Sequence, residues 1–138
     1  MSDPLDWYPD PDWADKPEEF IKHYYQVFDV DRAALYKFYR DRSMLSFTFS
    51  SDCKGAASIT RKLVDLPFRK DVQHKIHAME CQPSNDHGGV LVLVHGALFY
   101  NEPRQVVTFT ETFQLLPEGD SYFIFNDVFL ITHPEAKT

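Results

Sequence analysis

The segment 121-SYFIFNDVFLIT-132 decides the fold, because it is apolar on both of its alternating faces. In an extended strand, successive side chains point to opposite sides of the sheet. One side of this strand would carry Tyr122, Ile124, Val128 and Leu130. The other side would carry Phe123, Phe125, Phe129 and Ile131. The segment 90-VLVLVHGALF-99 has the same two-sided pattern, so we expect a sheet that needs apolar cover on both faces.

Four segments of the C-terminal half are rich in Val, Ile, Thr, Phe and Tyr, which favours strands. They span residues 72–82, 89–100, 105–116 and 121–132. Short stretches of Pro, Asn, Asp and Gly separate them, as is typical of turns. Connections this short between long strands predict an antiparallel meander.

The N-terminal half predicts helices instead. Apolar residues recur at helical spacing over 16–29, a second helix follows Asp31, and a third runs from Gly55 to Leu66, with a strand at 44–49 between them. Residues 1–14 are acidic and lack periodicity, so we interpret them as an irregular arm before a single domain at 15–138. The expected class is α+β, with three helices packed on one face of a strongly curved antiparallel sheet.

Three helices in a chain of 138 residues can cover only one face of that sheet. We expect a second copy of the chain to cover the other, in a two-fold dimer. The alternative is a curled sheet whose second face packs locally.

Composition excludes several classes of protein. The net charge of −7 argues against binding to nucleic acid, and we expect neither a membrane-inserted segment nor an export signal. The chain has only two cysteines, which is typical of a reducing compartment. We expect no metal site and no cofactor.

Signatures of catalysis are scarce. His74 and His77 should point to opposite faces of a strand, and we interpret His74 and His95 as structural. Glu111 and Asp127 have apolar neighbours on their own faces, which would raise their pKa as in a general base. An ion pair or a place at a rim explains these two acids equally well.

The residues resemble the nuclear transport factor 2 family over about 13–132. The resemblance lies in 20-FIKHYYQVFDVDR-32, 43-SML-45, 66-LPF-68, 72-VQH-74, Gly96 and 125-FNDVF-129. It implies a cone-shaped α+β domain that homodimerises through its sheet and is not an enzyme.

The resemblance also implies partners. Members carry the GDP-bound GTPase Ran into the nucleus and dock on Phe-Gly repeats of pore proteins, so we expect the chain in cytoplasm, nucleus and nuclear pore. The Ran-binding cavity would be lined or bordered by Phe47, Leu66, Phe68, His74, Leu98, Asn101, Glu102 and Phe129. The Phe-Gly dock would include Trp13 and Asp29.

The turn at 98–105 departs from the family, because it keeps one acid, Glu102, where Ran carriers cluster several. Asn101 stands where an Asp is expected, and Arg104 adds an opposing charge. This loss leaves three alternatives open: the small subunit of the mRNA-export receptor, a scaffold domain like that of stress-granule proteins, or an enzyme similar to ketosteroid isomerase or scytalone dehydratase.

Overall fold

The computed structural model describes residues 15–48 and 50–134, so Trp13 and the acidic arm lie outside the described residues. Three helices and six strands follow one another in the described chain. They are α1 (Asp15–Val30), the 3-10 helix η1 (Arg32–Phe38), β1 (Tyr39–Phe47), β2 (Cys53–Lys54), α2 (Ala56–Val64), β3 (Gln73–Pro83), β4 (Val90–Tyr100), β5 (Gln105–Glu118) and β6 (Ser121–Pro134). The three predicted helices and the four long strands are confirmed.

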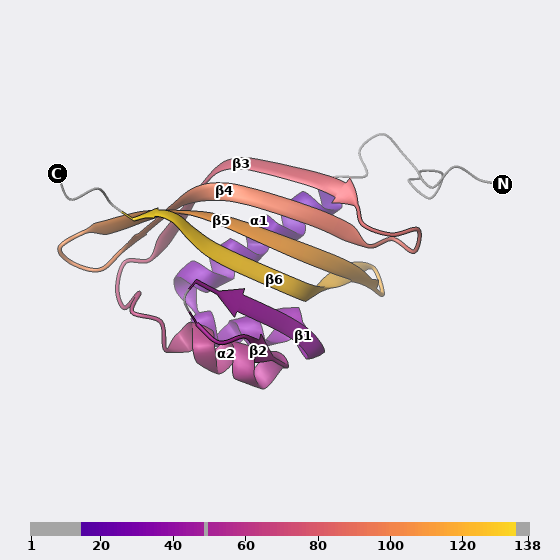
Figure 1. The fold of residues 1–138 in the computed structure, drawn as a ribbon, viewed down its shortest axis with the longest axis horizontal. Helices are drawn as coiled ribbons and strands as arrows, with labels where there is room; N and C mark the ends of the chain where they lie inside the picture. Colours follow the sequence, from indigo (N-terminus) through magenta and orange to yellow (C-terminus); the bar gives the residue numbers. More distant parts are fainter. Residues whose placement is uncertain (1–14, 49, 135–138) are drawn as a thin grey trace.

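The strands form one sheet in the order β2-β1-β6-β5-β4-β3 (Figure 1). The predicted meander is confirmed, because β3 to β6 pair antiparallel in chain order. The strand predicted at 44–49 begins earlier, at Tyr39, and lies parallel to β6. The sheet is therefore antiparallel except at this added strand.

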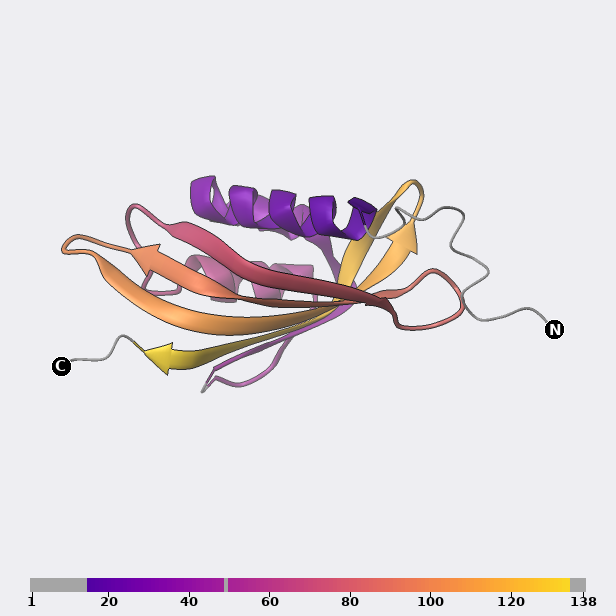
Figure 2. The same cartoon turned by 90° about the horizontal axis from the view of Figure 1, so that it is seen from above.

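Both helices α1 and α2 lie on the same side of the curved sheet (Figure 2). Helix α1 turns Ile21, Tyr24, Tyr25 and Phe28 into the core, as the helical spacing of apolar residues predicts. No other described segment covers the opposite, outer face of the sheet in this view. The α+β layering with helices on one face is confirmed.

The strict alternation predicted for residues 121–132 is wrong at Phe125. The pairing of β5 with β6 shifts there, so that Leu115 pairs with Ile124 and Gln114 with Asn126. This bulge places Ile124 in the same core cluster as Phe129, although the two residues have opposite parity. A bulge depends on the partner strand, which the sequence of one strand does not reveal.

Gly96 lies on β4 opposite Ile76 of β3, where the backbone of β3 leaves no room for a side chain. A Cβ atom at this position would come within 2.3 Å of the backbone oxygen of Lys75. Register shifts between Ile76 and Ala78 on β3, directly beside this contact. A glycine is therefore required here for the two backbones to approach each other.

We predict that Gly96→Ala destabilises the protein by about 1–3 kcal/mol, because the backbone of β3 must move to admit the methyl group. Chemical denaturation of wild type and variant measures the difference. Gly119→Ala is the matched control, since no atom lies within 4 Å of its Cβ position and only its positive φ is strained. Equal losses in the two variants would contradict the proposed backbone contact.

Candidate functional site

The outer face of the sheet carries a patch of exposed apolar side chains. Leu91, Leu93, Val128 and Leu130 are 38–49% exposed. Leu93 and Val128 lie in one row across β4, β5 and β6, because both pair with Thr112. The patch is therefore continuous, with threonines between its apolar side chains.

Three of the side chains expected at the Ran-binding cavity, those of Phe47, His74 and Phe129, meet in one aromatic cluster on the helix side. Phe47 stacks on Phe129 with ring centroids 4.6 Å apart, and Phe129 stacks on Phe109 at 5.1 Å. The edge of His74 meets Phe109 at 5.5 Å. Phe109, which the resemblance did not include, therefore joins three of the predicted residues.

Leu66, Phe68 and Leu98 belong to the same hydrophobic core and are at most 5% exposed. Phe129 is likewise 4% exposed, whereas Phe47 is only half-buried. The cluster is thus packed by its own side chains. Phe47 is therefore the ring of this group that is partly accessible to solvent.

Asn101 links the turn between β4 and β5 to the loop before β3 by hydrogen bonds. Its side-chain oxygen accepts hydrogen bonds from the backbone N–H groups of Arg69 and Lys70, at 2.8 and 3.2 Å, and its amide donates to the Pro67 carbonyl. Glu102 follows it, exposed and without an ion pair among the described residues. The bonds of Asn101 give this residue a structural role at the end of the sheet.

Asp29 lies at the end of α1 and binds β3. Its carboxylate accepts the backbone N–H of His74 at 2.9 Å and lies 2.6 Å from the His74 ring nitrogen Nδ1. The His74 side chain is 2% exposed and packs against Tyr25 and Phe28. Burial lowers the pKa of His74, and the charge of Arg32 lowers it further, whereas the Asp29 carboxylate opposes this shift; the net direction is downward, which favours the neutral ring.

The two acids singled out in the sequence meet beneath α1. Glu111 is 4% exposed and Asp127 is 1% exposed. Tyr25 donates to Glu111 Oε1 at 2.8 Å, and Tyr39 donates to Asp127 Oδ2 at 2.7 Å.

Tyr24 extends this buried network to a third tyrosine. Its hydroxyl lies 2.6 Å from that of Tyr39, so Tyr24 donates to Tyr39 because Tyr39 gives its own proton to Asp127. Burial raises the pKa of all three tyrosines well above the usual value.

The raised pKa values of the two acids favour a single proton shared between them. Burial raises the pKa of both carboxyl groups, and the charge of Asp127 raises that of Glu111 further. The buried oxygen Asp127 Oδ1 has no hydrogen-bond donor among the described residues while both acids are ionised. Protonation of Glu111 would add a donor beside the Asp127 carboxylate, and the upward pKa shift makes Glu111 the member of the pair that favours the neutral form.

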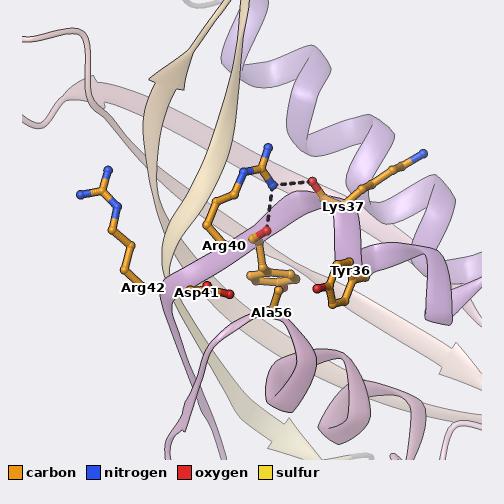
Figure 3. A pocket seen from close by; sticks show the side chains of 7 residues that line it. Tyr36, Lys37, Arg40, Asp41, Arg42 and Ala56 are labelled. Atoms are coloured by element: carbon orange, nitrogen blue, oxygen red, sulfur yellow. Dashed lines mark hydrogen bonds between the residues drawn. The ribbon is translucent and has the colours of Figure 1, made fainter.

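A basic groove lies between β1 and α2, and the sequence pattern did not predict it (Figure 3). It encloses about 470 Å³ and is lined by Tyr36, Lys37, Tyr39, Arg40, Asp41, Arg42 and Ala56. Arg40 forms a two-bond ion pair with Glu118, and Arg40 and Arg42 both lie over the ring of Phe123. Arg40 and Arg42 are two residues apart on β1, and residues at this spacing lie on the same face of a strand. This spacing could have predicted from the sequence that the two guanidinium groups lie together.

Within residues 15–48 and 50–134, no three His, Cys, Asp or Glu side chains gather as a metal site would require. In the same residues, no helix is long and apolar enough to cross a membrane.

We predict that Glu111→Gln removes a pH dependence of stability. Since the folded state raises the pKa of Glu111, its contribution is complete below about pH 4.5, the unfolded value, and is lost as pH rises through the folded value. The Gln side chain keeps an acceptor for Tyr25 and a donor for Asp127, so the variant should lose less stability between pH 5 and 9 than wild type. Thermal melts across this range measure the effect, with the exposed Glu19→Gln as control. Parallel wild-type and Glu111→Gln curves would contradict the shared proton.

Comparison with known proteins agrees with the family resemblance and with the observed fold. The model of the nuclear transport factor 2 domain matches residues 17–131. The chain is 47% identical to nuclear transport factor 2 of Emericella nidulans over 88% of this chain and 97% of that protein. The solved structure of nuclear transport factor 2 from Cryptosporidium parvum superposes with a TM-score of 0.79 at 33% identity, covering 89% of this chain and 97% of the other.

More distant structures share the fold alone. A protein of Novosphingobium aromaticivorans named for scytalone dehydratase superposes with a TM-score of 0.73 at 10% identity, covering 88% of each chain. The fold is therefore shared with some enzymes, whereas the relatives at high identity are named transport factors. From the matched domain and the identity over most of its length, the chain belongs to the nuclear transport factor 2 family.

Proposed function

We propose that this chain works as a dimer that carries GDP-bound Ran from cytoplasm to nucleus and docks on Phe-Gly repeats at the nuclear pore. The role of nucleocytoplasmic transport factor follows from the family. The dimer, the two partners and the location at the pore are our proposal. The observation that carries it is the exposed apolar patch on the outer face of the sheet.

The outer patch favours a second copy as its cover. Leu91 and Leu93 lie on β4, and Val128 and Leu130 lie on β6, with β5 between the two strands. Burial stabilises a complex by about 25 cal/mol per Å² of apolar surface removed from water. The threonines between them let hydroxyl groups pair across the interface. A self-complementary, mixed surface of this kind is typical of two-fold dimers.

Ran-GDP would bind at the end of the molecule that carries the β4–β5 turn. Phe47 is the half-buried ring of the aromatic cluster, available to an incoming aromatic side chain. Glu102 is the acid of the β4–β5 turn and is exposed, available to a lysine of the partner. Arg69, Lys70 and Arg104 are also exposed nearby and would weaken that contact.

Phe-Gly repeats would bind near the start of α1. Trp13 is the ring we assign to this dock. Asp29, which the resemblance also assigns to the dock, lies at the opposite end of α1, where its carboxylate holds His74, so its contribution would be to fix α1 against β3.

A second candidate is supported by the basic residues around Glu102. In the small subunit of an mRNA-export receptor, the same outer face would meet a homologous domain of a larger protein, and Ran would not bind. Catalysis finds less support, because Glu111 and Asp127 are almost completely buried and their hydrogen bonds are internal.

We predict that the wild-type chain sediments as a dimer and that Leu93→Glu is monomeric. A carboxylate in the centre of the patch would have to be desolvated in the interface. Val30→Glu is the matched control, since Val30 is 87% exposed at the end of α1, on the helix side of the sheet. A wild-type chain that stays monomeric, or a dimeric Leu93→Glu variant, would refute the proposed interface.

We predict that two variants lose affinity for different partners when binding to GDP-loaded Ran and to a Phe-Gly peptide is measured side by side. Glu102→Lys should weaken Ran at least about tenfold, since a charge-assisted contact contributes about 1.5–3 kcal/mol, and leave the peptide unaffected. Trp13→Ala should do the reverse, so that each variant is the control for the other. Failure of wild type to bind Ran, together with binding to a large export subunit, would favour the second candidate.

A further inference from the structure

Two histidines lie side by side on the outer face of the sheet, next to the apolar patch. The ring centroids of His77 and His95 are 5.9 Å apart, and both residues are exposed. His77 lies on the edge strand β3 at the register shift between Ile76 and Ala78, whereas His95 lies on β4. His77 lies on the face opposite to the buried His74, as alternation along β3 predicts, and the shift leaves Ala78 exposed directly after it.

Strand pairing places His95 within the patch. His95 pairs with Thr110, and Thr110 pairs with Leu130, so the three side chains lie in one row across the sheet. The His95 ring nitrogen Nδ1 is 3.4 Å from Thr110 Oγ1. Leu93 precedes His95 by two residues on β4 and lies in the neighbouring row, so a molecule that covers Leu93 and Leu130 also covers His95.

Few charged groups surround the pair. On β3, Glu80 pairs with Leu93 and Lys75 pairs with Ala97, each one row away from His95. Strand β5 supplies only threonines to the neighbouring rows, and on β6 the backbone of His133 pairs with Thr108. Neither His77 nor His95 forms an ion pair with a carboxylate among the described residues. A positive charge on either ring is therefore compensated by water, which a covering molecule would displace.

We propose that His77 and His95 are a proton switch on the interface between two copies of this chain, assembled at neutral pH and opened by acid. This inference rests on the proposed dimer. Histidine changes charge between about pH 5 and 8, so its protonation responds to physiological acidification. Protons bind to the separated copies, whose imidazoles are hydrated, in preference to the dimer, where the ring charges are desolvated and adjacent to one another.

The expected size follows from linkage. An equilibrium that is coupled to proton binding changes up to tenfold per pH unit for each proton taken up. Each dimer carries two copies of His95, so acidification from pH 7.5 to 5.5 should raise the dimer Kd by at least about tenfold. His74 takes no part in this effect, because it is buried on the helix side of the sheet.

Analytical ultracentrifugation at pH 7.5 and 5.5, with a chelator present so that metal ions do not bind the imidazoles, tests the switch. The wild-type Kd should rise at least about tenfold on acidification, while circular dichroism reports an intact fold. His77→Gln with His95→Gln, which keeps polar side chains that cannot gain charge, should give a Kd that does not change with pH. His87→Gln is the control, because the His87 side chain is 86% exposed in the β3–β4 turn and should leave the pH response unchanged.

The possible failures are distinguishable. A wild-type dimer with equal Kd at both pH values, or a double variant that keeps the pH response, overturns the switch and leaves the proposed dimer intact. A wild-type chain that is monomeric at pH 7.5 overturns the proposed dimer and the switch together.

Discussion

Removal of apolar surface from water on both sides of one sheet is the constraint on which the rest of this structure depends. On the inner side, α1 and α2 complete the core, with side chains such as Ile21 and Ile59 fully buried. On the outer side, Leu93 and Leu130 remain almost half exposed. The helices of this chain cover one face of the sheet, whereas both faces carry apolar residues. The uncovered face is suited to binding another protein, and a transport factor acts by binding other proteins.

The inner side contains acids as well as apolar groups, and this explains why α1 presents tyrosines to the sheet. Glu111 and Asp127 lie on neighbouring strands, where two ionised carboxylates would be unstable. Tyr25 and Tyr39 each donate a hydrogen bond to one of them, and a single proton removes one charge. Phenylalanine at either tyrosine would leave a buried carboxyl oxygen without a donor. The same acids in an open cavity would be candidates for catalysis, whereas here they join helix to sheet.

Near the β4–β5 turn, the side chain of Asn101 forms hydrogen bonds within the protein, at a position where the family resemblance predicted contact with a partner. Asn101 accepts from the backbone of the 69–70 segment, and Arg32 donates to the carbonyls of Leu63 and Phe68. These bonds fix the loop that carries Phe68, while the nearby charges are mostly basic. Family membership therefore establishes the fold and the transport role more firmly than it establishes each contact with a partner.

Local pattern in the sequence determined the helices and the four long strands, because spacing of apolar residues and turn chemistry are properties of neighbours along the chain. It also marked Glu111 and Asp127 as unusual acids and both faces of the sheet as apolar. Only the tertiary structure decided that these acids lie together and raise each other's cost of ionisation, that the bulge at Phe125 moves Ile124 inward, and that His77 meets His95. The physical reason is that strand register and the placement of α1 bring together residues far apart in sequence, and the free energy of their contacts belongs to the packed molecule.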